Sequence, residues 1–251
     1  MAQVRFCSKC GASLLGGEDR CRLCRSPLEA MTFVPEPKKA AQFDASPFVA
    51  VWLRPRDTVR SIVNSDPTYL VIPLAAVGGI VQTLDRAMGK NAGDVISLPI
   101  LLLMVLIAGP IGGVLGLQIG AALLHFTGKW LGGSATRAEI RAAVAWGGVP
   151  ALWGGLLWIP IIALAGGAAF TSDMGVDDVN GAALLLSGAM LLVQAGTAIW
   201  SIFTGLHALA EVQGFSAWKS VGNGVLAGLV VIVPIVVIGF GLAVLLVGRI
   251  G

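Results

Sequence analysis

Long, nearly uninterrupted apolar runs dominate the chain from about residue 69 onward, and short polar loops separate them. A membrane-spanning helix needs about 20 consecutive apolar residues, because each helical residue rises about 1.5 Å. Five runs meet or approach this length. The pattern therefore predicts an all-α membrane protein that folds as a five-transmembrane-helix bundle. The predicted spans cover residues 69–84, 95–127, 142–170, 181–210 and 221–247.

Several of these runs are longer than a bilayer requires and contain prolines. Pro110 lies in the second run, Pro150 and Pro160 in the third, and Pro234 in the fifth. Proline removes a backbone donor and disturbs the preceding turn of a helix. We therefore expect these spans to tilt, to kink or to extend into the headgroup region.

Small residues recur at every fourth position in three of the spans. Such stripes permit close approach between helices, either within one chain or between two copies in a homo-oligomer. The stripes are Gly112, Gly116 and Gly120; Gly147, Ala151 and Gly155; and Gly224 with Gly228.

The chain before the first span divides by composition. Residues 1–25 are rich in cysteine and basic residues, and residues 26–46 combine prolines with charged residues, which is typical of a flexible linker. Residues 47–251 form the predicted membrane domain. Only 12% of the 251 residues are charged, about half of the usual 25% in soluble domains, so the composition excludes an ordinary soluble enzyme.

The distribution of charge predicts the orientation of the spans. Ten of the 17 Lys and Arg residues precede residue 61, whereas the charged residues in the loop after the third span are all acidic: Asp173, Asp177 and Asp178. Basic flanks favour the cytoplasmic side of a membrane. The N-terminus is therefore expected in the cytoplasm and the C-terminus outside.

The stretch 47–66 predicts a short helix ahead of the first span. Pro55 suits the first helical turn, and Asp57 there would favour the helix dipole. Val59, Ile62 and Val63 fall on one face, while the basic residues Arg56 and Arg60 repeat four positions apart. We interpret this stretch as an amphipathic interfacial helix on the cytoplasmic leaflet; the alternative is a plain connector.

Four cysteines form the strongest motif in the sequence. Cys7 and Cys10 make one C-x-x-C pair, and Cys21 and Cys24 make a second after ten intervening residues. Two such pairs can supply four thiolates to one tetrahedral Zn²⁺ in a reducing cytoplasm. We therefore predict a structural zinc ribbon. A rubredoxin-like iron site, a redox dithiol pair and four unrelated thiols are the alternatives.

Polar residues in the membrane half suggest two weaker candidate sites. His125, Lys129, Glu139, His207 and Glu211 all fall near the same predicted end of the spans and could form an interfacial polar cluster. Deeper in the spans, a polar path could run past Gln118, Gln194, Thr197 and Ser201. The alternatives are histidines that anchor span ends and polar residues that hydrogen-bond neighbouring helices.

The sequence contains no G-x-S-x-G elbow, no H-E-x-x-H motif, no P-loop and no G-x-G-x-x-G after a predicted strand. The predicted span interiors contain no charged residue, because Asp85, Arg86 and Glu211 fall at boundaries. The sequence therefore does not predict an enzyme.

Residues 47 to 248 resemble the Yip family, five-span membrane proteins named for interaction with Rab-type GTPases in eukaryotes. The resemblance rests on an ordered set of residues: Trp52, Pro55, Arg56, Asp66-Pro67, Gly78-Gly79, Gly132-Gly133, Glu139, Trp146, Pro150, Trp200, Gly205-Leu206, Glu211 and Gly214-Phe215. It implies a cytoplasmic N-terminus, in agreement with the charge distribution. The zinc ribbon and the stretch Asp44–Phe48, which replaces a DLxGP-type segment, indicate a bacterial-type branch without Rab binding.

These observations favour a non-enzymatic scaffold, or a membrane-organisation or trafficking-type factor, in the bacterial inner membrane. It would contact membrane lipids and recruit a cytoplasmic protein partner through the zinc ribbon. A lipid or small-solute transporter or channel is the alternative. Nucleic-acid binding is disfavoured, because the basic ribbon carries few cations and no aromatic stacking platform.

The zinc site makes a direct prediction. Elemental analysis of the purified protein should find about one zinc per chain, because one tetrahedral ion needs all four thiolates. Cys21→Ser removes one ligand and should abolish the zinc signal. Iron in place of zinc, or no metal at all, would contradict the ribbon.

Overall fold

The computed structural model describes residues 5–6, 13–14, 46–172 and 181–250. The chain divides into two compact units, residues 1–40 and 41–251. In the first unit, strand β1 (Arg5–Phe6) pairs antiparallel with strand β2 (Ser13–Leu14), with Arg5 opposite Leu14 and Phe6 opposite Ser13. Cys7, Cys10, Cys21 and Cys24 lie outside the described residues.

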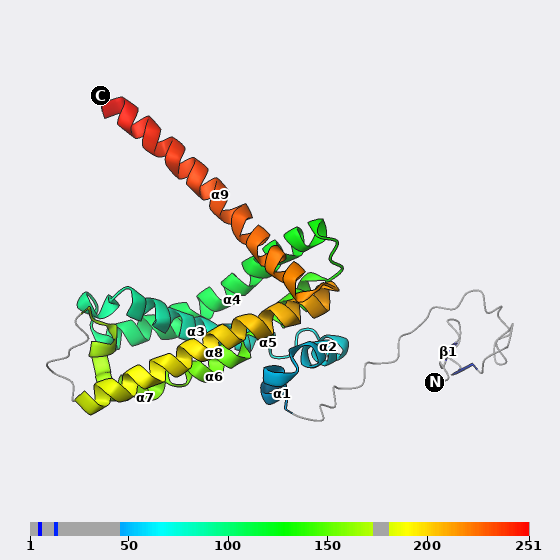
Figure 1. The fold of residues 1–251 in the computed structure, drawn as a ribbon, viewed down its shortest axis with the longest axis horizontal. Coiled ribbons are helices and arrows are strands. Elements are labelled where there is room, and N and C mark those ends of the chain that lie inside the picture. The colour runs from blue at the N-terminus through cyan, green and yellow to red at the C-terminus, as the bar shows by residue number, and fades with distance from the viewer. Residues whose placement is uncertain (1–4, 7–12, 15–45, 173–180, 251) are drawn as a thin grey trace. The chain divides into compact units, whose positions relative to one another are not determined.

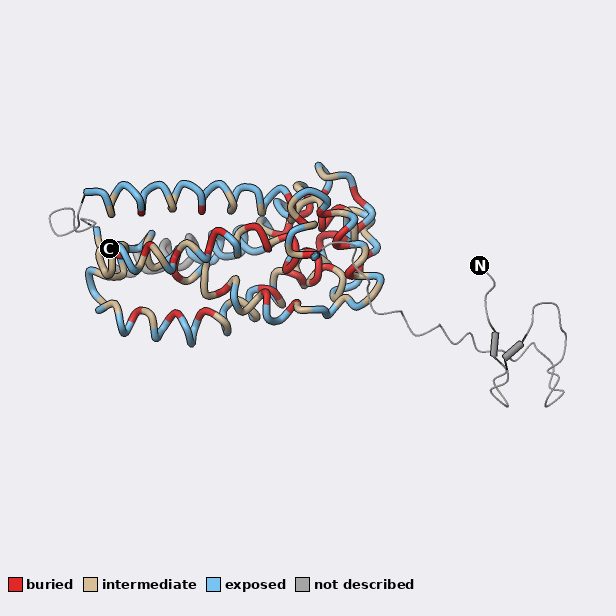
Figure 2. Tube along the Cα trace, turned by 90° about the horizontal axis from the view of Figure 1, so that it is seen from below, coloured by how far each residue is buried: buried red, intermediate tan, exposed pale blue. Residues whose placement is uncertain are grey.

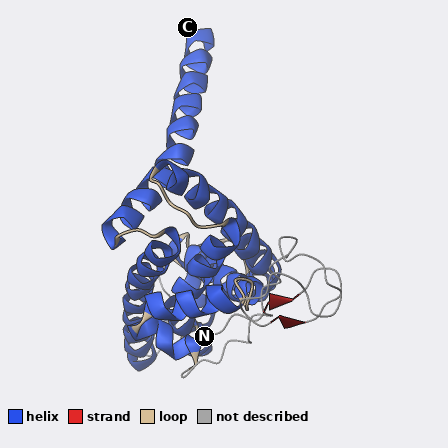
Figure 3. Ribbon diagram, turned by 90° about the vertical axis from the view of Figure 1, so that its right-hand side faces the viewer, coloured by secondary structure: helices blue, strands red, loops and turns tan. Residues whose placement is uncertain are grey.

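The described part of the second unit consists of helices joined by short loops (Figure 3). In chain order these are α1 (Pro47–Leu53), α2 (Pro55–Ser65), α3 (Val71–Gly89), η2 (Ala92–Asp94), α4 (Leu98–Trp130), α5 (Arg137–Gly147), α6 (Val149–Gly155), α7 (Trp158–Ala165), η3 (Gly166–Phe170), α8 (Gly181–Gln213) and α9 (Ala217–Ile250).

Within the described ranges, five helical segments are long and apolar enough to cross a membrane, which confirms the predicted all-α architecture. They are α3, α4, the segment from α5 to η3, α8 and α9. The helices extend past the predicted apolar runs by several residues, so that α3 includes Asp85 and Arg86 and α8 includes Glu211. Helix α9 contacts α4 and α8 and then extends away from the other helices (Figure 1).

The third span is broken into α5, α6, α7 and the 3-10 helix η3, as its two prolines lead one to expect. Pro150 follows the break between α5 and α6, and Pro160 follows the break between α6 and α7. A proline cannot donate to the carbonyl four residues earlier, so the hydrogen-bond ladder changes at each point.

Helix α8 satisfies a carbonyl that the first break leaves without its usual partner. The Ala151 amide donates to Gly148 rather than to Gly147. The Gly147 oxygen instead accepts hydrogen bonds from the Thr204 hydroxyl at 2.7 Å and the Ser201 hydroxyl at 3.3 Å. In lipid, where water is absent, such replacement partners make a broken helix tolerable.

Helices α3 and α4 approach closely through glycines. A Cβ built at Gly79 would overlap the Gly109 carbonyl oxygen, and one built at Gly113 would overlap the Ala75 carbonyl oxygen. The sequence stripe Gly112, Gly116 and Gly120 lies on another face, where a Cβ would meet nothing within 4 Å. The close contact therefore uses a different set of glycines from the one that the four-residue repeat indicates.

The other two stripes differ from each other. A Cβ at Gly147 would lie 2.5 Å from the Gly205 Cα of α8, and one at Gly155 would overlap Val81 of α3. In contrast, Gly224 and Gly228 of α9 have nothing within 4 Å of a built Cβ. The third span thus packs through its small residues, while those of α9 face open space.

Buried residues concentrate at the end of the bundle where α1 and α2 pack (Figure 2). Val51 of α1, Val59 of α2 and Trp146 of α5 are all completely buried in this core. The Trp146 indole Nε1 donates to the Tyr69 carbonyl at 3.0 Å, which fixes the loop between α2 and α3 against α5.

The glycine contact can be tested with a matched pair of substitutions. Gly113→Ala should lower the free energy of unfolding by about 1–3 kcal/mol, because the new methyl group forces α3 and α4 apart. Gly116→Ala, three residues along the same helix, has open space and should be neutral or stabilising by up to about 1 kcal/mol. Denaturant unfolding in detergent measures both. Equal destabilisation by the two changes would contradict the packing.

Candidate functional site

Helices α1 and α2 form a cap on the bundle and are the best-defined candidate surface for interaction. Pro55 begins α2, and Asp57 lies in its first turn as the sequence predicts. The apolar face of α2 is buried against protein: Val59 is 0% and Ile62 is 1% exposed, and the helix packs on α5 and α8. The interfacial interpretation expects this face to lie on the leaflet. In the structure, protein covers it instead.

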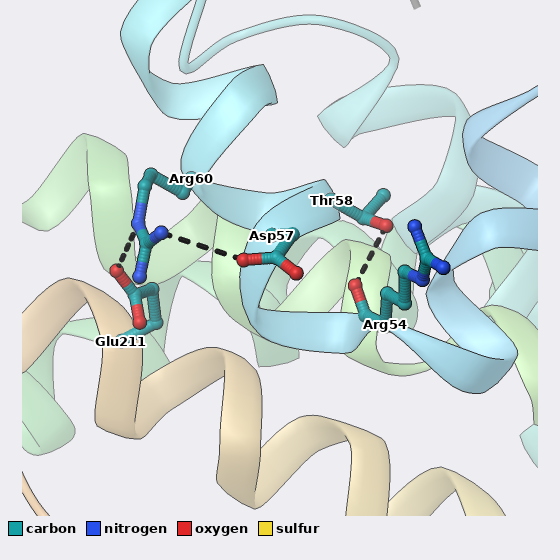
Figure 4. Close-up of polar contacts among 5 residues, drawn as sticks. All are labelled: Arg54, Asp57, Thr58, Arg60 and Glu211. Atoms are coloured by element: carbon teal, nitrogen blue, oxygen red, sulfur yellow. Dashed lines mark hydrogen bonds and ion pairs between the residues drawn. The ribbon is translucent and has the colours of Figure 1, made fainter. Parts of the chain in front are cut away.

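An ion pair between Arg60 of α2 and Glu211 of α8 fixes the cap (Figure 4). The Arg60 Nε donates to Glu211 Oε1 at 2.6 Å, and its Nη1 lies 3.4 Å from Asp57 Oδ1. The hydrogen bond and charge of Glu211 raise the pKa of Arg60 above its ordinary value. An arginine guanidinium is charged at any physiological pH, so Arg60 keeps its positive charge beside Glu211.

Two further contacts position the cap. The Trp200 indole of α8 donates to the Trp52 carbonyl of α1 at 3.1 Å. The Thr58 hydroxyl donates to the Arg54 carbonyl at 2.8 Å at the start of α2 (Figure 4). Neither Arg54 nor Arg56 forms an ion pair with any residue that the structure describes. The cap thus presents two cations that have no ion-pair partner among the described residues, and such cations suit anionic headgroups or acidic protein surfaces.

The predicted interfacial polar cluster is divided among separate local contacts. Glu139 forms a capping box with Thr136 at the start of α5. His125 Nδ1 lies 3.0 Å from the Ala135 carbonyl oxygen. His207 Nδ1 lies 2.9 Å from the Phe203 carbonyl oxygen of its own helix.

The other two members of that cluster also differ in their surroundings. Glu211 binds Arg60, and Lys129 is exposed. Across the ranges that the structure describes, no group of three or more His, Cys, Asp and Glu side chains could hold a metal ion. The five residues are therefore not gathered into one site of that kind.

The residues of the predicted polar path each make a defined hydrogen bond. Gln118 Oε1 of α4 accepts from Arg141 of α5 at 3.0 Å. The Thr197 hydroxyl donates to the Gln194 carbonyl within α8 at 2.8 Å, and Ser201 donates to Gly147 of α5. Gln118 and Ser201 thus join different helices.

Gln194 takes part in a hydrogen-bonded group around Asp85 that the sequence does not reveal. Its Nε2 donates to Asp85 Oδ1 of α3 at 3.3 Å, and the Trp158 indole of α7 donates to the same oxygen at 2.9 Å. Because α3 continues to Gly89, Asp85 lies one turn inside the helix end, whereas the apolar run alone places it at the boundary. In the sequence, the signal for this arrangement is a carboxylate directly after a long apolar run.

Asn223 is a second important residue that the hydropathy pattern misses. Completely buried in α9, it accepts a 2.6 Å hydrogen bond from the Thr127 hydroxyl through Oδ1 and donates to the Leu124 carbonyl at 3.2 Å. These contacts hold the first part of α9 against α4. An asparagine near the start of an apolar run is the signal that could have indicated an interhelical contact.

Comparison with protein families matches residues 49–242 to the Yip1 domain. Comparison with curated proteins and with solved structures gives no match.

The ion pair predicts a specific pattern of hydrogen exchange. Arg60→Gln and Glu211→Gln should each accelerate amide exchange in residues 55–65 several-fold, because α2 opens more often without its charged link. The double variant should exchange no faster than either single variant, since all three lack the same contact. Arg56→Gln is the matched control, because it removes a neighbouring cation that forms no ion pair with a described residue. Fully additive effects would show that the two side chains act separately.

Proposed function

The chain belongs to the Yip1 domain family, and on that premise we propose that it is a non-enzymatic membrane scaffold with a membrane-organising or trafficking-type role. It is a multi-pass membrane protein of several apolar helices. The observation that carries the proposal is the docked cap. An amphipathic helix whose apolar face is already covered offers a stable surface for a partner rather than an anchor that must insert into lipid.

In this proposal a cytoplasmic protein partner is recruited by the N-terminal module. Cys7, Cys10, Cys21 and Cys24 would bind one structural Zn²⁺, whose binding energy would fold a segment too short to form its own core. The pairing of β1 with β2 supports this assignment, because the two strands flank the first C-x-x-C pair in the sequence. Four thiolates fill the coordination of zinc, so the ion would have a structural role.

The proposal places the protein in a bacterial inner membrane, with its N-terminus in the cytoplasm and its C-terminus outside. The support is the concentration of basic residues before residue 61 and the acidic loop after the third span. This orientation would put the α1–α2 cap on the cytoplasmic side of the membrane.

Partner capture tests the recruitment step. Full-length protein, solubilised in mild detergent from cross-linked cells, should enrich a set of cytoplasmic proteins in quantitative mass spectrometry. Deletion of residues 1–40 and Cys21→Ser should both lose that set, because both remove the zinc-dependent fold. Ser8→Ala, which lies between two of the proposed ligands, is the control and should retain it. Capture of the same proteins by the deletion variant would overturn recruitment through this module.

A further inference from the structure

A crevice of about 540 Å³ runs between α3, α4, α5 and α6. This volume lies within the range of about 300–1,000 Å³ typical of small-molecule sites. On α3 it extends from Leu74 to Arg86, a distance of about 18 Å along the helix at 1.5 Å per residue.

Most of the crevice wall is apolar and made of small residues. Gly112 and Gly116 of α4 line it, and a Cβ built at either position would meet nothing within 4 Å. Leu74, Leu117 and Leu152 contribute the larger apolar surfaces. Gly112 and Gly116 thus leave space in the crevice, whereas Gly79 and its partners bring two helices into contact. The space suits a slender apolar group.

One end of the crevice carries two opposite charges on adjacent residues. Asp85 receives both of its hydrogen bonds, from Trp158 and Gln194, on Oδ1. Its Oδ2 has no hydrogen-bond partner in the part of the chain that the structure describes. Arg86 is exposed and likewise has no ion-pair partner among residues 46–172 and 181–239.

We propose that this crevice binds one phospholipid with an ethanolamine headgroup. The acyl chain would lie along the glycine-lined wall, the phosphate would bind Arg86, and the ammonium group would bind Asp85 Oδ2. The charge pattern of the site, an anion beside a cation, is complementary to that zwitterion. Three residues from the end of α3, Arg86 can reach the headgroup region of a bilayer.

The same features argue against other occupants. A helix from a second copy would fill the apolar wall but would offer no charged partner to Asp85 Oδ2 or to Arg86, which is costly next to lipid. A small polar solute would match the charged end but would leave most of the apolar crevice empty. Only an amphiphile satisfies the wall and its charged end together.

Native mass spectrometry of delipidated full-length protein tests the proposal. The probes are phosphatidylethanolamine and phosphatidylglycerol with identical acyl chains, titrated separately. The wild type should bind the ethanolamine lipid about tenfold more tightly, because only that headgroup offers an ammonium group to Asp85. Equal binding of the two lipids would overturn the headgroup assignment.

The acyl-chain site is tested by filling it. Gly112→Leu should weaken binding of both lipids about tenfold or more, because the new side chain occupies the crevice. Gly120→Leu, on the same helix and equally free of neighbours but outside the crevice, should leave binding unchanged. Equal affinities of the two leucine variants would overturn the proposal.

The charged end is tested independently of the crevice wall. Asp85→Asn keeps an acceptor for Trp158 and should abolish the preference for ethanolamine without weakening the glycerol lipid. Arg86→Gln should weaken both lipids about tenfold, because both contain the phosphate. If Gly112→Leu fails to fold by circular dichroism and gel filtration, these two variants decide the question. A preference for ethanolamine that survives Asp85→Asn would overturn the assignment.

Discussion

Helices in a bilayer gain little by burying leucine against leucine, because lipid tails are equally apolar. This bundle therefore depends on places where backbones come close. The central one joins α3 to α4 through Gly79, Gly109 and Gly113, where each glycine leaves no room for a Cβ. That contact sets the separation of the two helices at the point where they pack together. It also leaves Gly112 and Gly116 facing the open crevice instead of a neighbour.

The second constraint is that every backbone carbonyl in the membrane needs a partner. The break in the third span frees the Gly147 oxygen, and α8 supplies two hydroxyls to it. The broken segment thereby becomes bound to α8 as well as bent. The second break brings Trp158 to the start of α7, from which its indole reaches Asp85. The kinks in this span thus help to position the carboxylate at the end of the crevice.

The five spans could be predicted because charged residues are costly in lipid, so a membrane-spanning helix appears in the sequence as a long apolar run. The side of each helix that contacts its neighbours could not be predicted. A repeat of glycines at 112, 116 and 120 predicts a stripe, yet the contact with α3 uses 109 and 113, because which side of α4 meets α3 depends on the other helices. The partners of Asp85 and Asn223 were hidden for the same reason: each pairing joins residues 70 to 110 positions apart, and hydropathy carries no information about such pairs. Glu139 fits its capping box, a local pattern, whereas the link from Glu211 to Arg60 spans 151 positions.

The cap and the crevice share core residues. Leu74, Leu117 and Ala145 line the crevice and also belong to the cluster that buries Val59 and Ile62 of α2. A group that fills the crevice would contact the side chains on which the cap rests. The Arg60–Glu211 link restrains α2 from its outer face, while these shared residues support it from within. The crevice and the docked cap therefore share one group of packed side chains.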